Sequence, residues 1–272
     1  IKENKDLPEL INIIYNNEIP YIVNFAAQSM VAESWHNPSH WFNTNVISTI
    51  NLHNELKNFK FIKKYVHIST PEVYGNCTGL VNENFSFNPS TPYAVSRAAA
   101  DMSLNTYGEA YNFPYIITRA ANVYGPHQQL YRIIPRTILY LLLGKKLQLH
   151  GGGSSNRSFI HIEDVCDATL KIMLKGKIKN TYHISTNEII SIRSLVENIC
   201  DKLNISFEKN IDIVAERLGK DSNYSLDSSK LRKELSWDDL INLDSGIDRC
   251  IKWVTNNLST LQKQSFKYVH KK

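Results

Sequence analysis

The first half of the chain alternates short apolar runs with longer stretches of helical character. Each run is five or six residues long and rich in Val, Ile and Tyr, which is typical of buried parallel strands. The predicted helices lie near Asp6–Asn17, Trp41–Asn58 and Thr91–Tyr111, and the predicted strands are Tyr21–Phe25, Lys64–Ser69 and Tyr115–Arg119. This alternation indicates βαβ units, so we expect an α/β fold with a doubly wound parallel sheet, a Rossmann-like domain.

Beyond Arg119 the pattern loosens into shorter helices separated by short strands and loops. The predicted helices lie near Leu130–Leu143, Ile162–Leu174, Ser191–Leu203, Ser228–Leu235 and Leu243–Asn256. They predict a smaller α/β cap over the sheet. We assign residues 1–122 to the Rossmann-like core, with segments near 158–186 returning to it, and residues 123–272 mainly to the cap.

Composition and charge narrow the classes of protein that fit. At 272 residues and 42% hydrophobic, the chain can bury one large core or two coupled ones. The four cysteines form no C-x-x-C pair, and the nine histidines show no ligand spacing, so we expect a cytoplasmic protein without a metal site. The net charge of +5 is scattered, and the apolar stretch Ile133–Leu143 is too short to span a bilayer. The sequence also shows no signal peptide at its start. From the scattered charge we expect no nucleic-acid partner, and from the short apolar stretch we expect no membrane partner.

The glycine-rich turn of a Rossmann domain is not found in the sequence. Such a turn holds a pyrophosphate between the first strand and helix, yet all 11 glycines lie at or after Gly75. The first predicted strand is followed instead by Ala26-Ala27-Gln28-Ser29, and we interpret Gly151–Gly153 as a tight loop. We therefore expect the Rossmann-like domain to be incomplete at its N-terminal side, with about two segments of ~30 residues missing before the first visible strand.

Polar side chains that could take part in catalysis follow the second predicted strand. Thr70 and Glu72 come directly after it, and Tyr93 begins the third helix with Arg97 four residues later on the same face. Because the carboxyl ends of parallel strands are where an α/β sheet places its ligand, we expect these side chains to converge there. A cation near a phenol lowers its pKa, so Tyr93 is a candidate for accepting a proton from a hydroxyl group.

Three segments carry a family resemblance, and further matches follow in the same order. Tyr93–Arg97 resembles the Y-x-x-x-K signature of short-chain dehydrogenases, Ser69–Gly75 resembles the S-T-D-E-V-Y-G of nucleotide-sugar 4,6-dehydratases, and Asn24–Ser29 resembles their N-x-A-A-x-S loop. The further matches are Asn122–Pro126, Asn156–Arg157, Phe159–Asp164, Glu216–Asp221, Leu226–Asp227 and Leu235–Trp237. Over nearly its whole length the chain thus resembles the extended short-chain dehydrogenase/reductases, and most of all the dTDP-glucose 4,6-dehydratases of the NAD-dependent epimerase/dehydratase family.

The resemblance implies a lyase that uses bound NAD to convert a nucleotide-diphosphate hexose, dTDP-glucose above all, into its 4-keto-6-deoxy form. Thr70 would hydrogen-bond the 4-hydroxyl of the sugar, Tyr93 would deprotonate it, and Glu72 would remove the C5 proton. The positions that match the nicotinamide half of NAD are Ala26, Ala27, Thr44, Tyr93, Arg97 and Val123. Those that match the substrate are Ser29, Asn122, Arg132, Arg157, Asn187 and Arg217. The family also implies a homodimer joined through the helices near Trp41–Asn58 and Thr91–Tyr111.

Departures from the family pattern leave two other functions open. Pro71 stands where the dehydratases have the aspartic acid that protonates the departing C6 hydroxyl, Arg97 replaces the usual lysine, and Met30 replaces a histidine. His127 is a candidate replacement for the missing acid. A nucleotide-sugar 4-epimerase or related oxidoreductase needs Thr70 and Tyr93 but no acid at position 71. A catalytically silent sugar-nucleotide-binding protein is the alternative from another class.

Overall fold

A parallel sheet forms the centre of the larger lobe in the computed structural model, which describes residues 6–216 and 225–270. The strand order is β1-β2-β4-β9, and each neighbouring pair is parallel. The strands are β1 (Tyr21–Asn24), β2 (Lys64–Ile68), β4 (Tyr115–Ala120) and β9 (Asn180–Ile184). The predicted α/β fold with a parallel sheet is therefore confirmed.

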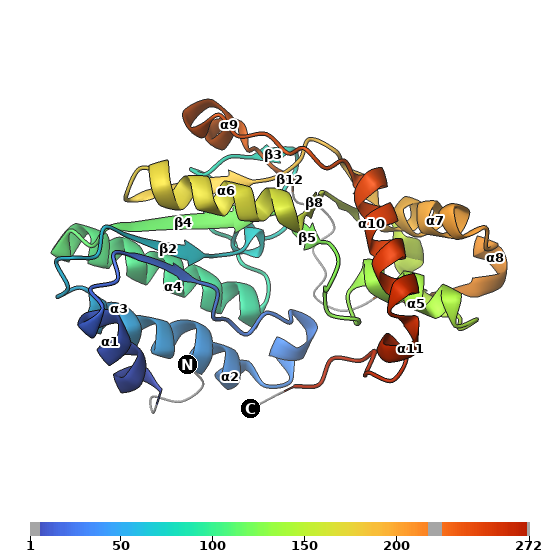
Figure 1. Cartoon of the computed structure of the whole chain (residues 1–272), viewed down its shortest axis with the longest axis horizontal. Helices are drawn as coiled ribbons and strands as arrows, with labels where there is room; N and C mark the ends of the chain where they lie inside the picture. The colour runs from blue at the N-terminus through green and yellow to red at the C-terminus, as the bar shows by residue number, and fades with distance from the viewer. Residues whose placement is uncertain (1–5, 217–224, 271–272) are drawn as a thin grey trace.

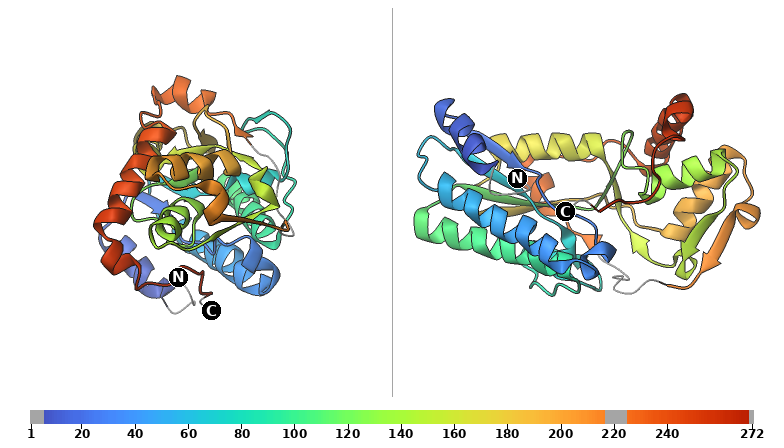
Figure 2. Two further views of the ribbon diagram at one scale, coloured as in Figure 1. Left: turned by 90° about the vertical axis from the view of Figure 1, so that its right-hand side faces the viewer. Right: turned by 90° about the horizontal axis from the view of Figure 1, so that it is seen from below.

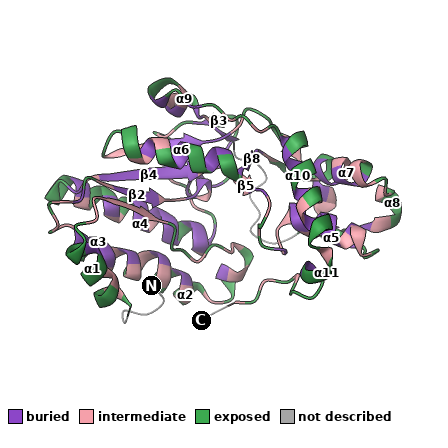
Figure 3. Ribbon diagram, viewed as in Figure 1, coloured by how far each residue is buried: buried purple, intermediate pink, exposed green. Residues whose placement is uncertain are grey.

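Helices cover both faces of this sheet (Figure 1). On one face lie α1 (Leu7–Asn16), α3 (Ser48–Leu56) and α4 (Pro92–Tyr111), and on the other lies α6 (Ile162–Lys175). The two middle strands are buried on both sides, which explains why β2 and β4 are nearly continuous apolar runs (Figure 3). Leu56, Tyr65, Leu104 and Ile117 form part of the core between the sheet and the first helical layer.

A second, smaller lobe lies beyond the carboxyl ends of the strands, as Figure 2 shows from below. Its elements are α5 (Ile133–Leu142), β6 (Leu147–His150), α7 (Ile192–Leu203), α8 (Phe207–Asn210), β11 (Ile211–Val214), α10 (Leu243–Asn256) and α11 (Leu258–Leu261). Strands β6 and β11 pair in parallel, and the helices bury Ile138, Leu195 and Ile247 in a common core. The lobe therefore has a hydrophobic core of its own.

The chain passes between the two lobes more than once. Strand β5 (Asn122–Tyr124) pairs in parallel with β8 (Phe159–His161), and α6 and β9 then lie on and in the main sheet. Helix α9 (Ser229–Leu235) packs beside β9. The remaining short elements are η1 (Ala32–Trp35), α2 (Pro38–Phe42), η2 (Asn43–Ile47), η3 (Pro71–Tyr74), β3 (Leu80–Val81), η4 (Gly151–Gly153), β7 (Asn156–Arg157), β10 (Ile190–Ser191) and β12 (Ser225–Leu226).

No helix among the described residues is both long and apolar enough to cross a bilayer.

Candidate active site

The loop after β2 brings a hydroxyl and a carboxylate together. Thr70 is extended and precedes the 3-10 turn η3, in which Pro71 occupies the first turn because its fixed φ suits that position. The Thr70 hydroxyl donates a hydrogen bond to Glu72. Gly75 ends the turn with a φ of +67°, and a Cβ there would lie 2.1 Å from the Asn88 carbonyl oxygen, so only glycine fits.

Helix α4 places Tyr93 beside this loop. The Thr91 hydroxyl caps the helix by accepting a hydrogen bond from the Ala94 amide at 3.1 Å, as its sequence predicts. The Tyr93 amide, one of the helix's free donors, donates to the Ser34 hydroxyl at 3.1 Å. The Tyr93 phenol is hydrogen-bonded to Thr70. Thr70 therefore touches both Glu72 and Tyr93, and the three predicted catalytic groups form one cluster.

The pKa of Tyr93 shifts in the direction opposite to the one that the sequence predicts. Burial is the largest cause, and together with the negative charge of Glu72 it raises the pKa to about 12. Arg97, the Thr70 hydrogen bond and Arg132 act in the other direction but do not outweigh burial. Arg97 itself thus acts in the expected direction, but burial outweighs it and the net pKa of Tyr93 is raised.

Arg97 is turned into the protein interior, which explains its limited effect. Its side chain is 1% exposed, and its Nη2 donates to the Ile68 carbonyl and lies 3.3 Å from His67 Nε2. Its Nε and Nη1 are buried without a hydrogen-bond partner in the described part of the chain. Burial and the nearby cations Arg97 and Arg119 hold the pKa of His67 well below its usual range, so His67 is neutral.

A cavity of about 790 Å³ opens in front of the catalytic cluster. Thr70, Glu72 and Tyr93 line one part of it, and the second lobe contributes other walls. Five of the predicted ligand-binding residues also line this cavity: Ser29, Asn122, Val123, Arg132 and Arg157. Val123, which we expected beside the cofactor, thus lies with the expected substrate residues.

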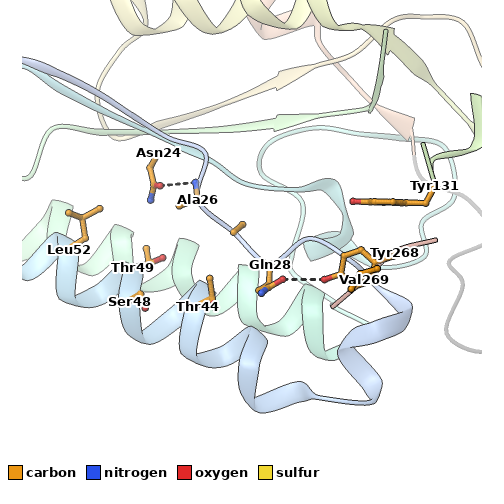
Figure 4. A pocket seen from close by; sticks show the side chains of 11 residues that line it. Asn24, Ala26, Gln28, Thr44, Ser48, Thr49, Leu52, Tyr131, Tyr268 and Val269 are labelled. Atoms are coloured by element: carbon orange, nitrogen blue, oxygen red, sulfur yellow. Dashed lines mark hydrogen bonds between the residues drawn. The ribbon is translucent and has the colours of Figure 1, made fainter. Parts of the chain in front are cut away.

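A second cavity of about 430 Å³ lies beside the loop that follows β1 (Figure 4). It is lined by Ala26, Ala27 and Thr44, three of the positions assigned to the nicotinamide half of NAD. Tyr131 lines both cavities, so the two spaces are neighbours. The residues that sequence reasoning missed here are Asn24, Gln28, Ser48, Thr49, Leu52, Tyr131, Tyr268 and Val269.

Asn45 fixes the loop between the two cavities, and the sequence analysis overlooked it. Its Oδ1 accepts a hydrogen bond from the backbone N–H of Gln28 at 2.8 Å. Its Nδ2 donates to the backbone carbonyl of Gln28 at 3.1 Å and to the Ser96 hydroxyl at 2.9 Å. Asn45 is fully buried in η2, a π-helical turn that interrupts an otherwise α-helical run. Such turns are frequent at functional sites, and this one ties the Gln28 loop to the helix that carries Tyr93.

A buried ion pair lies behind the catalytic loop. Asp101 on α4 accepts from the Ser69 hydroxyl at 2.7 Å and from Arg119 Nη2 at 2.8 Å. Both side chains of the pair are almost fully buried. Arg119 also donates to the Tyr74 hydroxyl at 2.6 Å, and that hydroxyl lies 2.8 Å from His183 Nε2. The network thereby joins β2, η3, α4, β4 and β9 directly under Thr70.

One of the predicted substrate residues is not brought to the cavities. Asn187 is exposed in the loop after β9 and lines neither cavity. Arg217 lies outside the described residues.

Comparison with known proteins identifies the family of this chain. The sequence model of the GDP-mannose 4,6 dehydratase family matches residues 3–250. The chain belongs to this family. Among its relatives, a dTDP-glucose 4,6-dehydratase of Xanthomonas campestris is 30% identical, over 89% of the chain and 74% of that protein. A trifunctional UDP-glucose 4,6-dehydratase of Arabidopsis thaliana is 34% identical over 92% of the chain, but the chain spans only 38% of its length.

Solved structures of dehydratases and epimerases share the fold of this chain. DesIV, a dTDP-glucose 4,6-dehydratase from Streptomyces venezuelae with NAD and TYD bound, superposes with a TM-score of 0.88 at 31% identity, covering 93% of this chain and 78% of its own. A UDP-glucuronic acid 4-epimerase from Bacillus cereus gives a TM-score of 0.86 at 25% identity, covering 93% and 79%. Dehydratases and an epimerase are therefore both similar to this chain.

Proposed function

We propose that the protein is an NAD-dependent nucleotide-sugar 4,6-dehydratase that acts on a nucleotide-diphosphate hexose, with dTDP-glucose as the first candidate. The observation that carries this proposal is the contact of Thr70 with both Glu72 and Tyr93 at the wall of the 790 Å³ cavity. DesIV, a relative by fold and sequence, was solved with NAD and TYD bound, which supports the same ligands here.

Each member of the cluster has a role in the proposed reaction. Thr70 would hydrogen-bond the 4-hydroxyl of the sugar, and Tyr93 would accept its proton. Bound NAD would supply the hydride acceptor. Glu72 would then remove the C5 proton, which the neighbouring 4-keto group acidifies. The C6 hydroxyl would leave as water and the hydride would return to C6, so that the net reaction is loss of water without net oxidation. Burial and Glu72 raise the pKa of Tyr93 to about 12, so the phenol is protonated at neutral pH and has to lose its own proton before it can accept one from the sugar.

The 430 Å³ cavity suits the nicotinamide and ribose of NAD. Ala26 and Ala27 leave room for a flat ring, and Thr44, Ser48 and Thr49 offer hydroxyl groups that a ribose can bond. No charged side chain lines this cavity among the described residues. The donor set of this cavity therefore fits the uncharged ribose better than a charged pyrophosphate.

The 790 Å³ cavity suits the sugar and its diphosphate. Arg132, Arg136 and Arg157 all line it, and arginine pairs well with phosphate oxygens because it donates two parallel hydrogen bonds. Arg132 also acts on the pKa of Tyr93, so its charge is felt at the catalytic end of the cavity. We assign Arg157 to the diphosphate and Arg132 to the boundary between diphosphate and sugar.

A 4-epimerase is the second candidate, and Pro71 is the observation that favours it. Elimination of the C6 hydroxyl needs a proton donor, and proline has none at its side chain. An epimerase needs only Thr70 and Tyr93 from the cluster. The similarity in fold to a UDP-glucuronic acid 4-epimerase supports this alternative.

Two finer features also belong to the proposal. The family resemblance suggests a homodimer through the helices near Trp41–Asn58 and Thr91–Tyr111, and the exposed apolar side chains Ile47, Val95 and Met102 in these segments support it. A cytoplasmic location stays a prediction from the spacing of the cysteines.

The test is product analysis of the purified protein incubated with dTDP-glucose and NAD. Formation of the 4-keto-6-deoxy sugar would support the dehydratase, and recovery of the C4 epimer would replace it by the epimerase. Tyr93→Phe is the control that removes only the phenol oxygen. If neither product forms, yet calorimetry detects binding of dTDP-glucose, the protein is a silent sugar-nucleotide-binding protein and the proposal fails.

A further inference from the structure

The C-terminal segment returns from the second lobe to the sheet lobe. After α11 the chain packs Phe266 against Tyr140 of α5 and then runs back toward α2 (Figure 1). Tyr268 and Val269 there line the 430 Å³ cavity, opposite the helical residues Thr44 and Ser48 (Figure 4). Residues 268–270, here named the C-terminal strap, thus lie more than 200 positions along the chain from the loop that they face.

Tyr268 contacts two walls of the cavity. Its hydroxyl donates to Gln28 Oε1 at 3.4 Å, and its ring meets the ring of Tyr131 edge to face, with centroids 5.5 Å apart. Gln28 belongs to the loop that follows β1, and Tyr131 lines both cavities. The Tyr268 side chain therefore connects the loop assigned to the cofactor with Tyr131, which also lines the 790 Å³ cavity.

His270 anchors the strap to the sheet lobe. Its ring stacks on Trp41 with centroids 5.1 Å apart, and it also stacks on His40 at 5.1 Å. His40 Nδ1 and His270 Nε2 are 2.8 Å apart, within hydrogen-bond distance. Trp41 is fully buried, so His270 packs on a ring that belongs to the interior of the sheet lobe.

We propose that the C-terminal strap is part of the cofactor site, with Tyr268 packing against the nicotinamide half of a bound dinucleotide. The strap covers the cavity without filling it, since about 430 Å³ stays open beneath it, within the range of ordinary ligand pockets. An aromatic ring at the wall gives a flat ligand a large contact area at low entropic cost. This inference rests on the proposed function, because it takes the dinucleotide from there.

The experiment measures NAD binding to Tyr268→Ala by calorimetry, without substrate. Removal of the ring and its hydroxyl is expected to weaken NAD binding about tenfold. Lys267→Gln is the matched control, because Lys267 is exposed beside the strap. This variant should bind NAD with the affinity of the wild type. Tyr268→Phe keeps the ring and is expected to lose only a few-fold in affinity.

A second measurement reports on the strap itself. Trypsin cleaves after Lys267, so NAD is expected to slow the release of the peptide that begins at Tyr268. His270→Ala, which removes the anchor, should speed this release even without NAD.

The outcomes separate this inference from the proposed function. Suppose that the wild type binds NAD. If Tyr268→Ala then binds NAD with unchanged affinity, or if NAD does not slow cleavage at Lys267, the role of the strap is overturned and the proposed function still stands. A wild-type protein that binds no NAD at all overturns both.

Discussion

Neutralising Asp101 tests whether the ion pair under the catalytic loop holds the protein together. Asn has the same shape, and its carbonyl oxygen can still accept from both Ser69 and Arg119. Asp101→Asn thus removes mainly the negative charge. It leaves the Arg119 guanidinium, which is 2% exposed, without the carboxylate charge that it contacts at 2.8 Å. Breaking a buried ion pair lowers the free energy of unfolding by about 3–5 kcal/mol. Because the asparagine keeps both hydrogen bonds, we expect a loss at the lower end of this range, about 3 kcal/mol.

The assay is urea unfolding of the wild type and of Asp101→Asn at neutral pH, followed by circular dichroism. A loss of about 3 kcal/mol is a large part of the roughly 5–15 kcal/mol that stabilises a typical domain. Asp212→Asn is the matched control, since the pair of Asp212 with Lys146, at 3.2 Å, is 48% and 63% exposed and should contribute under about 1 kcal/mol. If Asp101→Asn loses less than about 1 kcal/mol, the buried charge is compensated in another way and the reasoning is refuted.

Four further predictions concern the site and one buried histidine. Tyr93→Phe should lower kcat by about 10²- to 10⁴-fold without changing the melting temperature. Because Glu72 raises the pKa of Tyr93, Glu72→Gln should move the tyrosinate absorbance titration to lower pH, with Tyr93→Phe as the blank. Pro71→Asp should raise 4-keto-6-deoxy product formation at least about tenfold. Burial lowers the pKa of His53 to about 3. The folded protein therefore binds fewer protons than the unfolded chain below about pH 6.5, and the free energy of unfolding falls by up to about 1.4 kcal/mol per pH unit. In His53→Phe the free energy of unfolding should depend less on pH in this range.

Local signals in the sequence were sufficient to predict three of the four strands of the main sheet and the helices that cover it. Helix α4 is the clearest example, because Thr91, Pro92 and the following alanines act within one or two turns of the helix start. The same is true of β2 and β4, whose apolar runs follow from burial on both faces. Because the carboxyl ends of parallel strands lie at one edge of the sheet, the sequence also predicted that Thr70, Glu72 and Tyr93 lie close together, and their catalytic role stays a prediction.

Contacts between distant segments decide what the sequence could not predict. The direction of the Arg97 side chain depends on Ile68 and His67 on a neighbouring strand, so spacing along α4 predicted the right face but not the buried position. Asn45 acts through a π-helical turn, which has no clear sequence signal. Tyr268 reaches its cavity after the chain has crossed from one lobe to the other, and its surrounding sequence gives no indication of a ligand.

Pro71 shows why the backbone and the chemistry at one position have to be considered separately. In the sequence it is a lost acid, and this alone weakens the argument for dehydration. In the structure it occupies the first turn of η3, a position that proline suits, and Thr70 on one side still bonds Glu72 on the other. Pro71 therefore leaves the contact between Thr70 and Glu72 in place, and under the proposed function it removes only the proton donor of the elimination step. For this reason the fate of the C6 hydroxyl, rather than oxidation at C4, is the measurement that distinguishes a dehydratase from an epimerase in this protein.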